Sequence, residues 1–115
     1  MPAGLLLAAS ASGETTHTFS VTLTIGGDRA AHRLSGKVES DAPSEFCDDS
    51  TVRIMGAMPG KDKVLAHVQP TYSEWHLKSF PAIAGRRVYA EVLQYHLPSR
   101  PVICLGARSR TVTAP

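Results

Sequence analysis

Apolar and polar residues alternate along TFSVTLTI, residues 18–25, and this pattern restricts the fold more than any other feature of the chain. Successive side chains of a β-strand point to opposite faces of a sheet, so a period of two indicates a strand with one buried face. The apolar face holds four residues, Phe19, Val21, Leu23 and Ile25. We expect this strand to end at the Gly-Gly-Asp sequence that follows, which is typical of a turn.

Short segments of the same kind recur along the rest of the chain, separated by turn-forming residues. No segment of useful length has the apolar spacing of a helix, and Pro59–Gly60 marks a hairpin. This spacing predicts an all-β fold, which we interpret as a single antiparallel β-sandwich of about seven strands. The residues expected to face its core are Leu34, Val38, Val52, Ile54, Val64, Ala66, Val68, Trp75, Leu77, Val88, Ala90 and Val92.

The composition fits one globular domain. The chain has 115 residues, of which 43% are hydrophobic and 19% are charged, and its formal net charge is +2. A chain of this length forms one domain with a modest core. The small positive charge and the absence of P-loop, helix-turn-helix and RNA-binding sequence motifs argue against a nucleic-acid partner. The sequence contains no cofactor motif either, so we expect no cofactor.

The N-terminal sequence has the pattern of the end of a secretory signal peptide. Leucines and alanines form a short apolar run over residues 5–9, and Ala9-Ser10-Ala11 is a step that signal peptidase accepts. We therefore interpret residues 1–11 as a signal-peptide remnant and residues 12–115 as the β-sandwich domain. The run is too short to span a membrane. An extracellular location, secreted or associated with the cell surface, is expected.

The two cysteines, Cys47 and Cys104, are interpreted as a disulfide pair. Cysteines of secreted proteins are usually paired, and Cys104 has no histidine within seven residues to serve as the base of a catalytic thiol. Closing a loop of 57 residues contributes about 4 kcal/mol to stability in the chain-entropy model. We expect Cys104 to face the core near Val92, with Val88 near Arg108, in a hairpin formed by the last two strands.

Three stretches, GKVES…C…VRIM, AGRRVYAEV and VICLGARSRTVT, resemble immunoglobulin-like or prealbumin-like sandwich modules of secreted bacterial proteins. The prealbumin-like modules include transthyretin-like and carboxypeptidase-regulatory-like domains. The resemblance implies an accessory, adhesive or spacer role without chemistry of its own. Antibody domains differ, because Trp75 comes 28 residues after Cys47 and falls on another strand. The matching positions, within residues 34–113, are Gly36, Val38, Cys47, Val52, Ile54, Gly85, Val88, Ala90, Val92, Cys104, Ala107 and Ser109.

Four arginines of the last two predicted strands form a candidate binding patch. The predicted hairpin places two of them beside the other two, so the patch would suit an extracellular protein or an anionic glycan. An alternative is that Arg108 or Arg110 only neutralises Asp48 or Asp49 within the fold. The residues of the arginine patch are Arg86, Arg87, Arg108 and Arg110.

The histidines supply an alternative function. His67 and His76 face outward from neighbouring predicted strands, and Met55 lies on the strand before, so the alternative is a small extracellular copper-binding protein. The favoured interpretation assigns no metal ligand, because the chain lacks H-x-H and H-E-x-x-H spacing. Among the aromatic residues, Trp75 is expected in the core, whereas Tyr89 and Tyr95 are expected to be exposed.

An enzymatic function ranks third. Transthyretin-like hydrolases end in a Y-R-G-S type of tail, whereas this chain ends in SRTVTAP. No G-x-S-x-G elbow is present either. We therefore predict a non-catalytic secreted β-sandwich module with an extracellular binding or structural role, acting through the arginine patch if it binds through charge.

Overall fold

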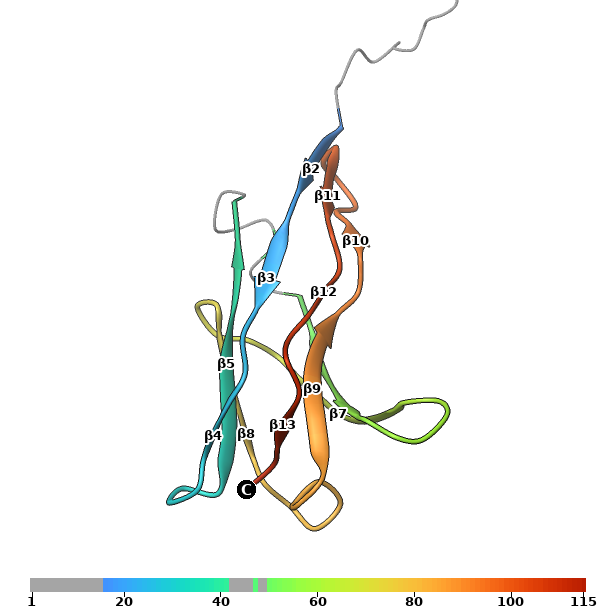
Figure 1. The fold of residues 1–115 in the computed structure, drawn as a ribbon. Coiled ribbons are helices and arrows are strands. Elements are labelled where there is room, and N and C mark those ends of the chain that lie inside the picture. Colours follow the sequence, from blue (N-terminus) through green and yellow to red (C-terminus); the bar gives the residue numbers. More distant parts are fainter. Residues whose placement is uncertain (1–15, 42–46, 48–49) are drawn as a thin grey trace, which may run out of the picture.

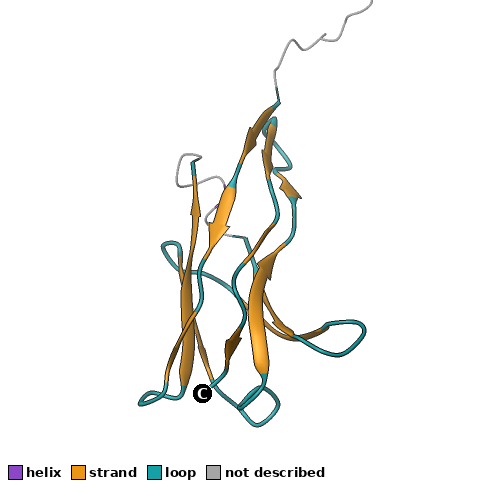
Figure 2. Ribbon diagram, in the orientation of Figure 1, coloured by secondary structure: helices purple, strands orange, loops and turns teal. Residues whose placement is uncertain are grey.

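The computed structural model describes residues 16–41, 47 and 50–115. This part of the chain is all-β, with three sheets of mostly antiparallel strands, as Figures 1 and 2 show. The predicted signal-peptide remnant, residues 1–11, lies outside the described residues. Within them, no helix is both long enough and apolar enough to cross a membrane.

The first sheet is built around its longest strand, β5. β3 and β4 pair antiparallel with different parts of β5, and β8 pairs antiparallel with it as well. Because β4 and β8 both pair with residues 33–35, they lie on opposite sides of β5. The strands of this sheet are β3 (Val21–Leu23), β4 (Gly26–Asp28), β5 (Arg33–Ser40) and β8 (Glu74–Lys78).

The second sheet has the order β12–β9–β6–β7, and β13 pairs with β9 beyond β12. Its strands are β6 (Val52–Gly56), β7 (Lys63–Val68), β9 (Arg87–Val92), β12 (Ala107–Arg108) and β13 (Val112–Thr113). A third, small sheet has the order β10–β11–β2, in which β2 runs parallel to β11. Its strands are β2 (His17–Phe19), β10 (Tyr95–His96) and β11 (Val102–Cys104).

The two larger sheets share one apolar core, which confirms most of the inward positions predicted from alternation. Trp75 from β8 is its largest fully buried side chain, as expected. Burial of each large apolar side chain contributes about 1.5–3 kcal/mol, so this shared core holds the sheets together. The core residues are Leu23, Ile25, Leu34, Val38, Val52, Ile54, Trp75, Ile83, Val88, Ala90, Val92 and Ala114.

Two details of the strand pattern were predicted wrongly. The Gly-Gly-Asp sequence is strand β4 rather than a turn, because its backbone pairs with β5 and needs no side chain to do so. Between β6 and β7, Ile54 of β6 pairs with Ala66 of β7, but the next residue, Met55, pairs with Val64, so the register skips Leu65. Because of this irregularity, the side chains at the start of β7 point in the opposite direction to the one predicted. Val64 is 36% exposed, and Leu65 packs against the core instead.

The predicted register of the last hairpin was also wrong. Tyr95 from β10 lies opposite Cys104, whereas Val92 lies opposite Ala107 and Val88 opposite Val112. The short strand β10 extends the hairpin beyond β9 and shifts the pairing. Cys104 therefore lies in a separate cluster rather than in the main core.

A serine side chain continues the pairing of β9 between β12 and β13. The Ser109 hydroxyl oxygen accepts the backbone N–H of Ala90 at 2.8 Å and donates to the carbonyl of Arg110 at 2.8 Å. The backbone N–H of Ser109 also donates to the Ala90 carbonyl, at 2.9 Å. Ser109 is buried, so these bonds satisfy groups that water does not reach.

Close packing explains the glycine at Gly36 of β5. A Cβ at this position would lie 1.9 Å from the Thr24 carbonyl oxygen and 2.7 Å from Nε1 of Trp75. Trp75 is the register partner of Gly36 on β8, so the ring and the Thr24 backbone occupy the space of a side chain. A residue with a side chain cannot fit here without displacing the backbone.

Gly36→Ala should therefore lower the free energy of unfolding by about 1–3 kcal/mol or more, as overpacking does. Gly26→Ala is the matched control, since a Cβ there would have no neighbour within 4 Å. Urea denaturation of both variants measures the difference. Equal effects of the two substitutions would show that the contact with Thr24 and Trp75 does not limit the packing.

The predicted disulfide between Cys47 and Cys104 is present. The bonded cysteines form a second buried cluster with Val102, and Phe19 and Leu97 pack against it. This cluster holds the small sheet against the segment that precedes β6. The disulfide therefore fastens the end of the molecule that the main core does not reach.

The double substitution of Cys47→Ser and Cys104→Ser should lower the free energy of unfolding by about 4 kcal/mol, because the unfolded chain regains the freedom of a 57-residue loop. Urea denaturation of the oxidised protein and of the double variant tests the loss. Thiol titration under denaturing conditions without reductant should find no free thiol, and two free thiols would contradict the bond.

Candidate functional site

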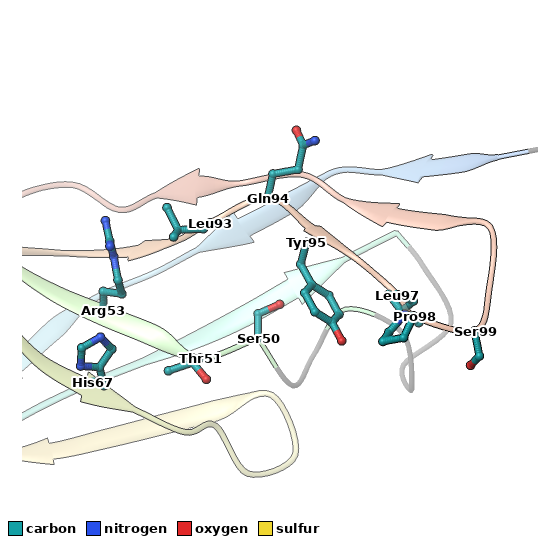
Figure 3. Close-up of a pocket in the computed structure, with 10 residues that line it drawn as sticks. All are labelled: Ser50, Thr51, Arg53, His67, Leu93, Gln94, Tyr95, Leu97, Pro98 and Ser99. Carbon is teal, nitrogen blue, oxygen red and sulfur yellow. The ribbon is translucent and has the colours of Figure 1, made fainter.

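A groove of about 800 Å³ lies between the β6–β7 part of the second sheet and the β9–β11 connection. Figure 3 shows side chains from the start of β6 and from β7 along one side and those of the β9–β11 connection along the other. The Gln94 side chain points away from the other labelled side chains in this view. The volume is within the usual range of ligand-binding clefts. The described residues that line the groove are Ser50, Thr51, Arg53, His67, Leu93, Gln94, Tyr95, Leu97, Pro98 and Ser99.

The disulfide connects the two sides of the groove. Ser50 follows Cys47 on one side, and its hydroxyl donates to the Cys47 carbonyl at 3.3 Å. On the other side, Tyr95 is the register partner of Cys104. The covalent bond therefore ties β11, the partner strand of β10, to the segment that leads into β6. A ligand in this groove would contact two segments far apart in the sequence that one crosslink joins.

The side of the groove formed by the β9–β11 connection is apolar and accessible. Leu93 is 56% exposed and Tyr95 is 46% exposed, although both are large hydrophobic side chains. Leu97 and Pro98 continue this side toward β11. Exposed apolar side chains that gather around a concavity are typical of a binding surface.

The side of the groove formed by β6 and β7 carries a guanidinium and an imidazole. Arg53 and His67 lie opposite each other on β6 and β7, and both line the groove. No carboxylate occurs among the described residues that line it. Among the described residues, Arg53 pairs with Glu91 on β9, which bonds to the guanidinium and is not among the lining residues.

Glu91 lies at the centre of a row of charged side chains across three strands, β6, β9 and β12. It is the register partner of Arg53 on one side and of Arg108 on the other. Arg108 donates to the second Glu91 oxygen at 3.4 Å. The hydrogen bond from Arg53, and then that from Arg108, lower the pKa of the Glu91 carboxyl against the opposing effect of burial. One carboxylate thus faces two guanidinium groups.

Tyr89 is buried, contrary to the prediction of an exposed side chain. The ring points outward from β9, but the guanidinium of Arg108 covers it at 4.5 Å from the ring centre. Only 3% of the residue remains exposed. The Tyr89 hydroxyl donates to Asp62, and this hydrogen bond raises the pKa of Tyr89 and lowers that of Asp62. Tyr95 is exposed, as predicted.

The structure does not bring the four arginines into the predicted pairs. Arg87 lies opposite Thr113 rather than near Arg108. Arg108 bonds to Glu91, and Arg110 donates to the Ile25 carbonyl at 3.2 Å. Arg86 instead donates to the sulfur of Met58 at 3.5 Å. These separate contacts follow from the shifted hairpin register. The alternative partners Asp48 and Asp49 lie outside the described residues.

The residues of the copper-binding hypothesis lie in different sheets. His67 is on β7 of the second sheet, whereas His76 is on β8 of the first, so these strands do not pair as predicted. Met55 is buried between Tyr89 and Val64 in the register. Across the described ranges, no group of three or more histidine, cysteine, aspartate or glutamate side chains could hold a metal ion.

Sequence reasoning missed Arg53, Leu93 and Leu97 as members of a site. Arg53 and His67 do carry a signal, because each lies one position out of phase with the core residues of its strand. Leu93 carries another, since it is apolar directly after the buried Val92 and so breaks the alternation. Their position around one groove depends on the β10 pairing, which the sequence pattern did not indicate.

Comparisons with protein-family models, with curated proteins and with solved structures gave no significant match.

Acid should destabilise the protein in part through Glu91. The pKa of Glu91 in the folded state lies below the ordinary value of 4.5. The contribution of the ionised carboxylate to the free energy of unfolding is therefore complete above about pH 4.5 and is lost as the pH falls through the folded-state pKa. Glu91→Gln should therefore be less stable than the wild type at about pH 7, yet lose less stability between about pH 7 and pH 3.

Urea denaturation at several pH values checks this prediction. Arg53→Gln should reduce the same pH dependence, since Arg53 makes the leading contribution to the lowered pKa of Glu91. A Glu91→Gln variant whose stability falls with acid as steeply as that of the wild type would contradict the assigned role.

Proposed function

We propose that the chain is an immunoglobulin-like or prealbumin-like β-sandwich that serves as a non-catalytic extracellular binding module. The distribution of strands supports the fold, since β3, β4, β5 and β8 form one sheet and β6, β7, β9, β12 and β13 form the other. The two sheets share one core, as the sheets of a sandwich do. The disulfide differs from that of antibody domains, because it joins the segment before β6 to β11.

The compartment is part of the proposal. Disulfides persist in oxidising environments, and small secreted domains use them to compensate for a modest core. The apolar run and the Ala-Ser-Ala step at the N-terminus point in the same direction.

The observation that carries the proposal is the groove, with its disulfide-linked sides and its exposed Leu93 and Tyr95. A binding role is favoured over catalysis because two hydroxyls that line the groove have structural partners. Ser50 donates to the Cys47 carbonyl, and Thr51 donates to the Gln69 side chain at 3.0 Å. The arginine patch is a less favoured binding surface, since Arg108 and Arg110 have contacts within the fold.

Binders selected from a random-peptide display library against the oxidised protein should depend on the groove. Tyr95→Ala should weaken their binding at least about tenfold, which corresponds to the loss of about 1.4 kcal/mol from one aromatic contact. Tyr72→Ala is the matched control, because Tyr72 is 95% exposed and does not line the groove. Fluorescence anisotropy of each selected peptide gives the affinities.

Selected peptides that bind the Tyr95→Ala and Tyr72→Ala variants equally well would contradict the groove as the binding site. Binding lost instead on replacement of Arg87 and Arg108 would favour the arginine patch.

A small copper-binding protein is the alternative from another class, and a transthyretin-like hydrolase ranks below it. The separation of His67 and His76 into different sheets weighs against a shared metal site. Equilibrium dialysis with Cu²⁺ and Zn²⁺ distinguishes a metal carrier from a binding module. Binding of either ion at micromolar concentration, lost in His67→Ala, would favour the carrier.

A further inference from the structure

We infer that the groove binds an extended peptide segment of a partner protein, in which bulky apolar residues lie next to acidic residues. This inference rests on the proposed binding function and adds the chemistry of the partner. The apolar side chains would lie against Leu93, Tyr95 and Leu97, and the carboxylates would lie against Arg53 and His67.

The strand order favours an extended chain as the occupant. β7, which carries His67, is at the edge of the second sheet, and β10, which carries Tyr95, is at the edge of the small sheet. Edge strands offer backbone donors and acceptors to an added strand, with side-chain contacts supplying specificity. The groove adjoins β10, whose edge away from β11 has no partner strand among the described residues, so an extended peptide could pair with β10 and place side chains against Arg53 and His67.

The charge of the groove favours acidic residues in the peptide. Arg53 and His67 line it, and no carboxylate occurs among its described lining residues. Glu91 is shared between Arg53 and Arg108 and lies outside this lining. Asp62, an acidic group among the described residues, interacts with Tyr89 and Arg108 instead. An acidic side chain on the β6–β7 side of the groove would therefore meet the Arg53 guanidinium, which Glu91 engages from outside the lining, and the His67 imidazole, with no carboxylate among the described lining residues.

The exposed apolar side favours bulky side chains next to the acidic ones. Leu93 and Tyr95 are each about half exposed, so contact with a partner would remove substantial apolar surface from water. Aromatic side chains such as Tyr95 are frequent anchors of interfaces because their large area is ordered at low entropic cost. Because these residues remain accessible along one side, the groove suits a chain that continues beyond it better than an enclosed small molecule.

Fluorescence anisotropy with four dye-labelled heptapeptides tests the inference on the full-length oxidised protein. The first contains Phe-Leu-Glu-Glu at its centre, and the others replace these residues with Phe-Leu-Gln-Gln, Phe-Leu-Lys-Lys or Ser-Ser-Glu-Glu. The first peptide should bind about tenfold more tightly than the glutamine peptide, as expected for a charge-assisted hydrogen bond. Its affinity should fall with added salt. The lysine and serine peptides should bind more weakly still.

Two matched pairs of variants locate the contacts. Tyr95→Ala should weaken the first peptide about tenfold, whereas Tyr72→Ala should not. His67→Ala should reduce the preference for glutamate over glutamine, whereas His76→Ala on the first sheet should leave it unchanged. All four side chains are solvent-accessible, so the variants should fold like the wild type.

The outcomes separate this inference from the proposed function. Equal binding of the glutamate and glutamine peptides, still lost in Tyr95→Ala, would overturn the acidic partner but keep the groove as a binding site. Binding of none of the peptides, while display-selected binders depend on Tyr95, would overturn the inference and again keep the proposed function. Concentration-dependent dimerisation abolished by Tyr95→Ala would instead identify a second copy of the chain as the occupant.

Discussion

The covalent bond between Cys47 and Cys104 determines how one end of the molecule is arranged. The main core joins the two larger sheets without it, but the small sheet has only a minor cluster of its own. The bond supplies what that cluster lacks, because it fixes β11 to the segment that enters β6. Since β10 pairs with β11, the position of Tyr95 depends on the same bond, and the geometry of the groove depends on it in turn.

Alternation of apolar and polar residues was sufficient to predict an all-β fold, most of the core and the position of Trp75. Alternation predicts which face of a sheet each side chain points to, but it contains no information on which backbone groups pair. Gly26 and Gly27 read as a turn because glycine has no side chain to alternate, although their backbone forms β4. The hairpin register failed because β10 has only two residues, both exposed, and so shows no apolar pattern.

The candidate site was less predictable than the fold for the same reason. The arginine patch was inferred from neighbours in a register that the structure shifts, and that shift separates Arg87 from Arg108. His67 was considered with His76, although its cross-strand neighbour is Arg53 on β6. Tyr89 was assigned correctly to the outer face, yet alternation could not show that Arg108 would cover it. Contacts between strands distant in sequence decide each of these cases.

The parallel pairing of β2 with β11 has a mechanical consequence. β2 lies at one end of the molecule and the C-terminal residue at the other, as Figure 1 shows. Tension applied between Thr16 and Pro115 would pull β2 and β11 in opposite directions along their length. The hydrogen bonds of such a pair carry the load together instead of opening one after another. The disulfide on β11 would keep that strand anchored while the load acts.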